Sequence, residues 1–404
     1  MPSAAPGLVA PERCTPPAAD GAPAGTGPAV LRLADVHRVA TGRGQVVAVI
    51  DTGVAPHPLL AGRLTGAGDY LTGGSGLTDC DGHGTAVAGL VAAAPVGIAP
   101  GARVLAIRQS SPSHTVPGPD GPRPPGDTDT LAEAVVLAVR SGAGVVNVSE
   151  AVCLPPDRAA AAGARLQAAL RYAADAGTVV VAAAGNAGSG SCTADADGRV
   201  ALPGWYDDHV LTVGATGPDG RPAAFSVPGP WVDVAAPGTG LRSLAVDGGT
   251  TAEGVTGTSF AAPWVAGLAA LVRERYPQLS AAEVVERIVA TARPVPDPAG
   301  AAGAGVVDPL AALRGPAGPA VTELRPGPPR TRRRSTRWPR VGGPAGPAVT
   351  ELAGPAPDPP PDGVPVDLVA TAVLVGAAAL AAAVVRGRPR GSPGGRPGDR
   401  RGNP

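Results

Sequence analysis

The sequence predicts an α/β domain built on a doubly wound, mostly parallel sheet flanked by helices. Valine-rich runs without polar alternation recur along the chain, and such runs are typical of strands buried on both faces. Segments with helical spacing separate these runs, and this alternation favours right-handed crossovers between parallel strands. The expected strands lie at 44–53, 102–109, 142–149, 177–186 and 209–216.

The clearest helical patterns cover 130–142 and 157–177. Both end in glycine, which commonly follows the last turn of a helix. A strongly apolar helix is expected to begin at Ser259, with Trp264 and Tyr276 spaced so as to face the core.

Residues 109–127 are too polar and too rich in proline for a strand or a helix. We expect a long surface loop there, with His114 in solvent. Two other histidines, His57 and His209, are expected to be structural, the second of them beside a strand.

The composition indicates which residues build the core and which partners are excluded. Apolar residues make up 44% of the chain but aromatic residues only 2%, so the core must be built from valine, alanine and leucine. The 59 glycines and 49 prolines among 404 residues exceed average usage, so part of the chain is expected to lack regular structure. The 33 basic residues balance 33 acidic ones, which argues against a nucleic-acid-binding protein.

The chain changes character on either side of a central domain. We expect an N-terminal extension, a globular domain, a Pro/Gly/Arg-rich linker, a transmembrane helix and a cytoplasmic tail. Their bounds are 1–30, 31–313, 314–363, 364–386 and 387–404. The decapeptide GPAGPAVTEL occurs twice in the linker, and two copies in a proline-rich stretch indicate a duplicated linker rather than a folded repeat.

The membrane segment contains 18 consecutive residues without a charge, 368–385. At about 1.5 Å per residue these span about 27 Å, close to the roughly 30 Å hydrocarbon core; a soluble alanine-rich helix is the alternative. Arg386, Arg388 and Arg390 follow, so the positive-inside rule predicts a single-pass protein of the cell membrane with an extracytoplasmic domain and a cytoplasmic C-terminus. Residues 1–30 hold no apolar run of signal-peptide length, so either the true start lies upstream or the N-terminus has been trimmed.

The four cysteines are Cys14, Cys80, Cys153 and Cys192, and none belongs to a CxxC pair. Zinc-ribbon and thioredoxin-like sites therefore have no support. In an exported chain four scattered cysteines usually pair, with three possible connectivities, whereas in a cytosolic chain they are more often buried thiols.

Four polar residues stand where predicted strands end or predicted helices begin. Asp51 follows the strand in VAVIDTGV, His83 begins the helical pattern of DGHGTAVAGLVAA, and Ser259 opens GTSFAAPWVAGLAALV. Asn186 follows another buried strand in AAAGNAG. Acyl transfer needs such a set, because a serine hydroxyl becomes nucleophilic when an imidazole oriented by a carboxylate takes its proton. The amide can bind the oxyanion that develops.

Each of these residues alone has a structural explanation, for example Asp51 as a turn former or Ser259 as a helix cap. A calcium site is conceivable at Asp79 and Asp81, but few further oxygen ligands lie nearby. We therefore expect no metal and no organic cofactor.

The motifs DTGV, HGTAVAG, AAAGN and GTSFAAPWVAG, in this order, resemble the signatures of the subtilisin-like serine peptidases. The resemblance covers residues 31–313 and implies a serine endopeptidase. It implies Asp51, His83 and Ser259 as the catalytic triad and Asn186 as the oxyanion donor.

The resemblance also bears on substrate binding. The segment GVVNVSE (144–150) is similar to the family segment beside which a substrate strand pairs, so Ser149, Glu150 and Gly185 are expected to bind substrate. Many members have Leu-Gly-Gly after the serine, whereas this chain has Glu150 followed by Ala151. The sequence therefore does not predict which side chains the specificity pocket accepts.

A narrower resemblance is to the mycosins, the membrane-anchored proteases of actinobacterial type VII secretion systems. It rests on the placement of the cysteines, the proline-rich linker and the C-terminal apolar segment. It implies the pairs Cys14–Cys80 and Cys153–Cys192. The expected partners are protein or peptide substrates, the membrane and components of the secretion complex, and no nucleic acid. The alternative function is a structural subunit that stabilises a secretion membrane complex, with proteolysis secondary.

Overall fold

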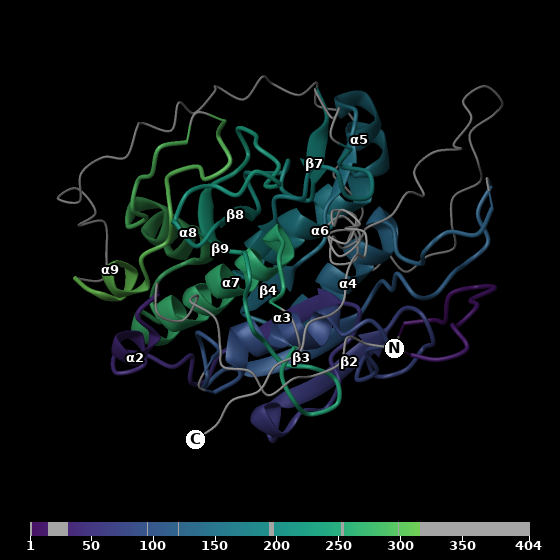
Figure 1. Ribbon diagram of the computed structural model, residues 1–404, viewed down its shortest axis with the longest axis horizontal. Helices are drawn as coiled ribbons and strands as arrows, with labels where there is room; N and C mark the ends of the chain where they lie inside the picture. The colour runs from purple at the N-terminus through teal and green to yellow at the C-terminus, as the bar shows by residue number, and fades with distance from the viewer. Residues whose placement is uncertain are drawn as a thin grey trace, which may run out of the picture.

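The computed structural model describes residues 2–14, 31–94, 96–119, 121–193, 198–251, 254–297 and 299–315. These residues form a sheet between two layers of helices (Figure 1). The predicted linker 314–363 lies outside the described residues except for its first two positions, and so do the predicted transmembrane helix 364–386 and the tail 387–404. Within the described ranges, no helix has both the length and the apolar character that a membrane span requires.

The described strands of the main sheet are β1 (Val46–Asp51), β2 (Leu64–Asp69), β3 (Arg103–Arg108), β4 (Val145–Val148), β6 (Val179–Ala183), β8 (Leu211–Thr216) and β9 (Val234–Pro237). They pair in parallel in the order β2–β3–β1–β4–β6–β8–β9. A separate antiparallel pair joins β5 (Val152–Leu154) to β7 (Val200–Leu202). The predicted parallel sheet is thus confirmed, and β1 and β4 are neighbours near its centre.

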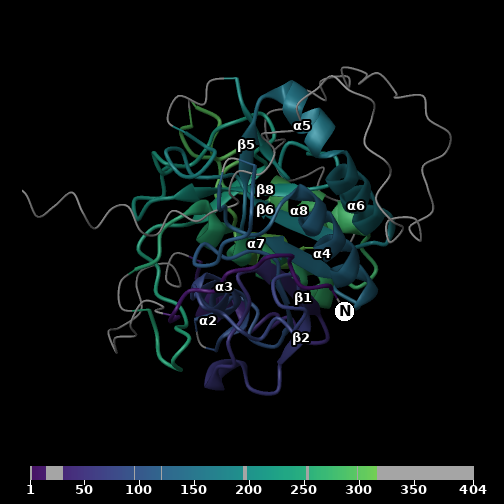
Figure 2. The same cartoon turned by 90° about the vertical axis from the view of Figure 1, so that its right-hand side faces the viewer.

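The described helices are α2 (Leu33–Val36), α3 (His83–Ala92), α4 (Thr128–Arg140), α5 (Pro156–Ala162), α6 (Ala164–Asp175), α7 (Thr258–Arg275), α8 (Ala281–Ala290), α9 (Pro309–Leu313) and the 3₁₀ helix η1 (Pro58–Leu60). Figure 2 shows α4 and α6 side by side on one face of the sheet. Residues of β1 alternate between the two faces: Val47 and Val49 pack with α3 and α7, whereas Ala48 and Ile50 pack with α4 and α6. This alternation produces two apolar cores, one on each side of the sheet.

The two edge strands of the sheet, β2 and β9, were not predicted. β2 reads LTGAGD, in which two glycines and polar residues interrupt the apolar run, and β9 reads VAAP, only 4 residues that end in proline. Proline and glycine are tolerated at sheet edges, where a ladder hydrogen bond is not needed on both sides. The hydrophobic pattern is therefore weakest where the strand has only one neighbour.

The predicted helix over 157–177 is two helices, α5 and α6, which meet at Gly163. The Tyr206 ring lies against Gly163, and its hydroxyl donates to the carbonyl oxygen of Ala159 at 3.2 Å. A side chain at position 163 would collide with that hydroxyl.

The expectation of a solvated His114 is wrong. The segment after β3 turns inward, so that His114 is only 5% exposed and its Nδ1 lies 2.8 Å from the hydroxyl oxygen of Ser111. Burial and the Arg108 guanidinium lower the pKa of His114. By contrast, Trp264 and Tyr276 are buried as predicted, and His57 is structural because its Nδ1 accepts from the N–H of Leu59.

The N-terminal residues 2–14 pack along the β2 side of the sheet. The N–H of Ala5 donates to the carbonyl of Leu71, and Val9 exchanges backbone hydrogen bonds with Thr115. Disulfides join Cys14 to Cys80 and Cys153 to Cys192, the pairing that the resemblance implies.

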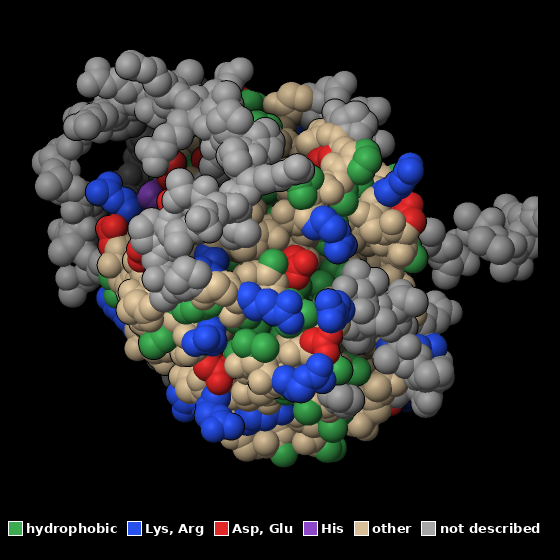
Figure 3. Space-filling model, turned by 90° about the vertical axis from the view of Figure 1, so that its left-hand side faces the viewer, with side chains coloured by type: hydrophobic (Ala, Val, Ile, Leu, Met, Phe, Trp, Pro, Cys, Tyr) green, Lys and Arg blue, Asp and Glu red, His purple; other side chains and the backbone are tan. Residues whose placement is uncertain are grey.

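Arginine side chains on the described face in Figure 3 lie among acidic, apolar and neutral ones. This mixture agrees with the balanced charge of the chain.

Candidate active site

Three residues of the predicted site lie at the carboxyl edge of the sheet. Asp51 is the last residue of β1, Ser149 follows the neighbouring strand β4, and Asn186 lies just beyond β6. Parallel strands all end at the same edge, where open α/β sheets place their ligands. Topology therefore brings together residues that are far apart in the sequence.

Asp51 and His83 form a buried pair. The Nδ1 of His83 lies 2.6 Å from Oδ1 of Asp51. Asp51 is 0% exposed and His83 is 4% exposed. The N–H of Thr52 donates to the same Oδ1 at 2.8 Å. Gly84 makes the close approach feasible, because a Cβ at this position would overlap the carbonyl oxygen of Gly53. A carboxylate at Nδ1 fixes the imidazole tautomer that leaves Nε2 as a base.

The electrostatics of the site favour the protonated imidazole. Burial by itself lowers the pKa of His83, but the negative charges of Asp51, Asp79 and Asp81 outweigh this effect and raise it above its ordinary value of 6.5. The Nε2 of His83 is buried and has no hydrogen-bond partner among the described residues. The nitrogen that would act as the base is therefore unoccupied, and the Ser259 hydroxyl is not hydrogen-bonded to it in this structure.

Asp79 organises the turn that precedes His83. Its Oδ1 accepts from Thr52 Oγ1 at 2.9 Å and from the N–H groups of Asp81 and Gly82 at 3.1 and 2.8 Å. Its Oδ2 accepts from the N–H and the hydroxyl of Thr85 at 2.8 and 2.6 Å. Burial raises the pKa of Asp79 to about 6, so the group is largely ionised at neutral pH. In the described part of the chain, no group of three or more His, Cys, Asp or Glu could hold a metal ion.

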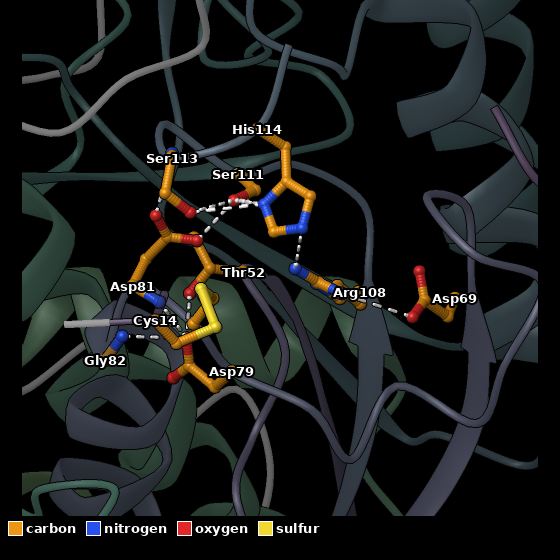
Figure 4. Close-up of a disulfide and its surroundings, with 11 residues drawn as sticks. Cys14, Thr52, Asp69, Asp79, Asp81, Gly82, Arg108, Ser111, Ser113 and His114 are labelled. Carbon is orange, nitrogen blue, oxygen red and sulfur yellow. Dashed lines mark hydrogen bonds and ion pairs between the residues drawn. A yellow bond between two sulfur atoms is a disulfide. The ribbon is translucent and has the colours of Figure 1, made fainter. Parts of the chain in front are cut away.

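A polar network surrounds the Cys14–Cys80 disulfide beside this turn (Figure 4). Asp81 accepts from the hydroxyl of Ser111 and, at 3.0 Å, from the N–H of Ser113. The network continues through His114 to Arg108, the last residue of β3. Arg108 pairs at 3.5 Å with Asp69, the last residue of the edge strand β2. The extension is therefore joined covalently to the turn that positions His83. The sequence could not reveal this network, because its members come from β2, β3 and two loops.

Ser259 lies in the first turn of α7 and is 4% exposed. The ring of the next residue, Phe260, packs against His83 with 4.9 Å between ring centroids. The hydroxyl of Ser149 donates to the backbone carbonyl of Ser259 at 2.7 Å, and Asn147 Nδ2 in turn donates to Ser149 Oγ at 2.8 Å. These contacts hold the start of α7 against the ends of the central strands.

The side-chain amide of Asn186 is fixed by Thr258. Oδ1 of Asn186 accepts from the N–H and hydroxyl of Thr258 at 2.9 and 3.0 Å. A Cβ at Gly257, where φ is 153°, would lie 2.9 Å from Ser259 Oγ and 3.2 Å from Asn186 Nδ2. The serine hydroxyl and the amide nitrogen therefore border the same small space. Sequence reasoning missed Thr258, although its place directly before the serine was a usable signal.

The expected substrate-binding residues make their polar contacts within the protein. The N–H of Gly185 donates to Thr258 Oγ1 at 3.1 Å, and its carbonyl accepts from Val227 at 3.0 Å. The side chains of Ser149 and Glu150 are both buried. A role for these three residues in substrate binding stays a prediction, and for Ser149 and Glu150 it rests on their backbone.

Known proteins resemble this chain in both sequence and fold. Residues 42–309 match the subtilase family of peptidases. Mycosin-4 of Mycobacterium tuberculosis is 45% identical over 309 residues, which cover 70% of this chain and 67% of that protein. The solved MycP3 protease from the type VII (ESX-3) secretion system has a TM-score of 0.68 at 39% identity, over 78% of this chain and 95% of that one. A chain of an intact ESX-5 inner membrane complex has a TM-score of 0.70 at 33% identity and covers 90% of both.

Proposed function

The chain belongs to the subtilase family and is a mycosin-like serine protease, and we propose that it is a membrane-anchored endopeptidase of a type VII secretion system with the triad Asp51, His83 and Ser259. The observation that supports this most strongly is the buried 2.6 Å contact between Asp51 and His83, made beside the start of α7 with Nε2 of the imidazole unpartnered among the described residues. Such a pair has a clear use in acyl transfer.

In the proposed reaction, Ser259 Oγ attacks the scissile carbonyl carbon while Nε2 of His83 takes the hydroxyl proton. Asp51 holds the Nδ1–H and stabilises the imidazolium. Nδ2 of Asn186 and a backbone N–H near Ser259 donate to the oxyanion. The C–N bond then breaks as His83 gives its proton to the leaving amine. Water attacks the acyl-enzyme through the same base, which regenerates the Ser259 hydroxyl and releases the acid.

Two observations support the membrane anchor. Residues 368–385 carry no charge over a length that matches the hydrocarbon core, and three arginines follow them. A relative of this fold is part of an ESX-5 inner membrane complex and matches 90% of this chain. Disrupting the anchor with Leu374→Asp, which puts a charge inside the apolar segment, should move the protein from the membrane fraction to the soluble fraction.

The second candidate is a structural subunit of the secretion membrane complex. The same ESX-5 match favours it, because that relative is present as a component of an assembly. Fluorophosphonate labelling of the purified full chain, with Ser259→Ala as control, tests the enzyme. Secretion in cells that carry only Ser259→Ala tests the subunit. A wild-type protein that neither labels nor cleaves any peptide of a library would end the enzyme proposal.

A further inference from the structure

Glu150 is a buried carboxyl group at the edge of the active site that the proposed mechanism does not use. β4 pairs with β1 up to Val148 and Ile50, so Glu150 lies beside the strand end that carries Asp51. The residue is 3% exposed. The hydroxyl of Ser110, which follows β3, donates to its Oε1, and its Oε2 is buried without a partner among the described residues. The carboxyl group thus joins segments that follow β3 and β4, on either side of β1.

The surroundings of Glu150 contain no counter-charge for a carboxylate among the residues described. A small cavity beside it is lined by Thr128 and Leu131 of α4, Leu166 of α6, and Val152 and Leu202 of the β5–β7 pair, none of which titrates. Ser110 contributes a neutral hydroxyl, and the charge that acts on Glu150 is the negative charge of the Asp51 carboxylate on β1, which is itself paired with His83.

An unpaired buried anion is costly, so such a group keeps its proton instead. Burial raises the pKa of Glu150 well above its ordinary value of 4.5, and the negative charge of Asp51 raises it further, although the Ser110 hydrogen bond opposes both. Burial and the lack of a counter-charge among the described residues therefore both favour the protonated, neutral form of Glu150.

A displacement of Glu150 would also displace Ser149, which is hydrogen-bonded to Ser259. Ser149 precedes Glu150 directly and holds the backbone carbonyl of Ser259 at 2.7 Å. An ionised Glu150 must leave its apolar surroundings for water, and the neighbouring residues must follow.

We propose that Glu150 is a positioning residue that works as a neutral carboxylic acid, and that loss of its proton at alkaline pH displaces residues 149–151 and slows acylation of Ser259. This inference rests on the proposed function, since it concerns the same serine and histidine. The proton passes to solvent hydroxide, and no covalent bond other than that O–H bond is made or broken at Glu150.

The test compares the full-length wild type with Glu150→Gln, which preserves the shape and cannot ionise. Fluorophosphonate labelling rates are measured from about pH 6 to pH 10, together with thermal unfolding midpoints. In the wild type, the rate should rise as His83 loses its proton and then fall, whereas Glu150→Gln should keep its plateau and be about tenfold faster at the alkaline end.

The thermal midpoints provide a readout that does not depend on activity. The unfolded wild type loses the Glu150 proton near the ordinary value of 4.5, whereas the folded protein retains it. Stability from this group is therefore lost as pH rises above that value, and the wild-type midpoint should fall relative to Glu150→Gln.

Two further variants sharpen the result. Glu133→Gln removes a glutamate whose pKa is also raised by burial, but which lies on α4 and pairs with Arg165 at 3.6 Å. It should leave the alkaline fall unchanged. Ser110→Ala removes the hydrogen bond that favours the ionised form, so it should move the alkaline fall to higher pH.

The outcomes are decisive. An alkaline fall that persists in Glu150→Gln, or that disappears equally in Glu133→Gln, overturns the proposal. If Glu150→Gln does not fold, an alkaline fall at the wild-type pH in Ser110→Ala overturns it. If the wild type does not label at any pH, the proposed function fails, and the difference in thermal midpoints still decides whether Glu150 is neutral.

Discussion

Asp79 should prove as important to the active site as the residues that carry the chemistry. It accepts five hydrogen bonds, and through Thr52 it connects the end of β1 to the start of α3, because Thr52 Oγ1 also accepts from the N–H of Gly84 at 2.9 Å. We therefore expect Asp79→Ala to lower both the stability of the domain and the reactivity of Ser259.

The magnitude follows from the burial of the five donors. The N–H groups of Asp81 and Gly82 are partly buried, so water can replace the lost acceptor, and the hydroxyls of Thr52 and Thr85 can turn elsewhere. The N–H of Thr85 is buried and cannot turn. At about 1–3 kcal/mol for a buried donor left unsatisfied, the free energy of unfolding should fall by about 1–3 kcal/mol.

Reactivity should fall because His83 begins the helix that this turn positions. A misplacement of about 1 Å costs about 10²-fold in rate, so fluorophosphonate labelling of Asp79→Ala should slow by about that factor while the protein remains folded. Urea unfolding gives the stability, and labelling without denaturant gives the reactivity.

Two variants control this experiment. Asp79→Asn keeps one acceptor oxygen, which can accept from the buried N–H of Thr85, so it should lose less stability than Asp79→Ala. Asp81→Ala lies on the other side of Cys80 and removes the acceptor for Ser111 and Ser113, with a cost of about 1 kcal/mol. Its labelling should change little at a pH where His83 is neutral, since Asp81 acts on His83 only by raising its pKa. Folded Asp79→Ala that labels as fast as the wild type would refute the reasoning.

Three further predictions concern the triad and the oxyanion. Asp51→Asn should slow peptide hydrolysis about 10⁴-fold with thermal stability nearly unchanged, because the imidazole tautomer is lost while the packing remains. A decrease in the hydrolysis rate of less than about tenfold would contradict the proposed role of Asp51. Asn186→Ala should lower kcat by about 10²–10³ with little change in KM, a magnitude borrowed from subtilisin, and an effect confined to KM would argue against an oxyanion donor. Since the pKa of His83 is raised and the base must be neutral, kcat/KM should rise with pH through a midpoint above 6.5, and a pH–rate profile with a lower midpoint would disagree.

The sequence alone predicted the class of the fold and the chemistry of the site. The five central strands are continuous apolar runs, and this pattern arises because both of their faces are buried. The candidate site residues were identifiable because catalysis by serine needs an imidazole and a carboxylate, and because Asp51, His83 and Ser259 occur in a characteristic order. The strand patterns and the motifs are each local, and the order of the motifs can be read along the chain without the fold.

Tertiary structure decided what holds these residues in place. Ser149 and Ser259 are 110 positions apart, and Asn186 and Thr258 are 72 apart, yet both pairs are hydrogen-bonded. It also decided that His114 is buried, and that Glu150 lies in an apolar environment beside Asp51. A residue's burial and its partners depend on which strands are neighbours in the sheet, and strand order is set by the packing of the whole domain rather than by any one segment.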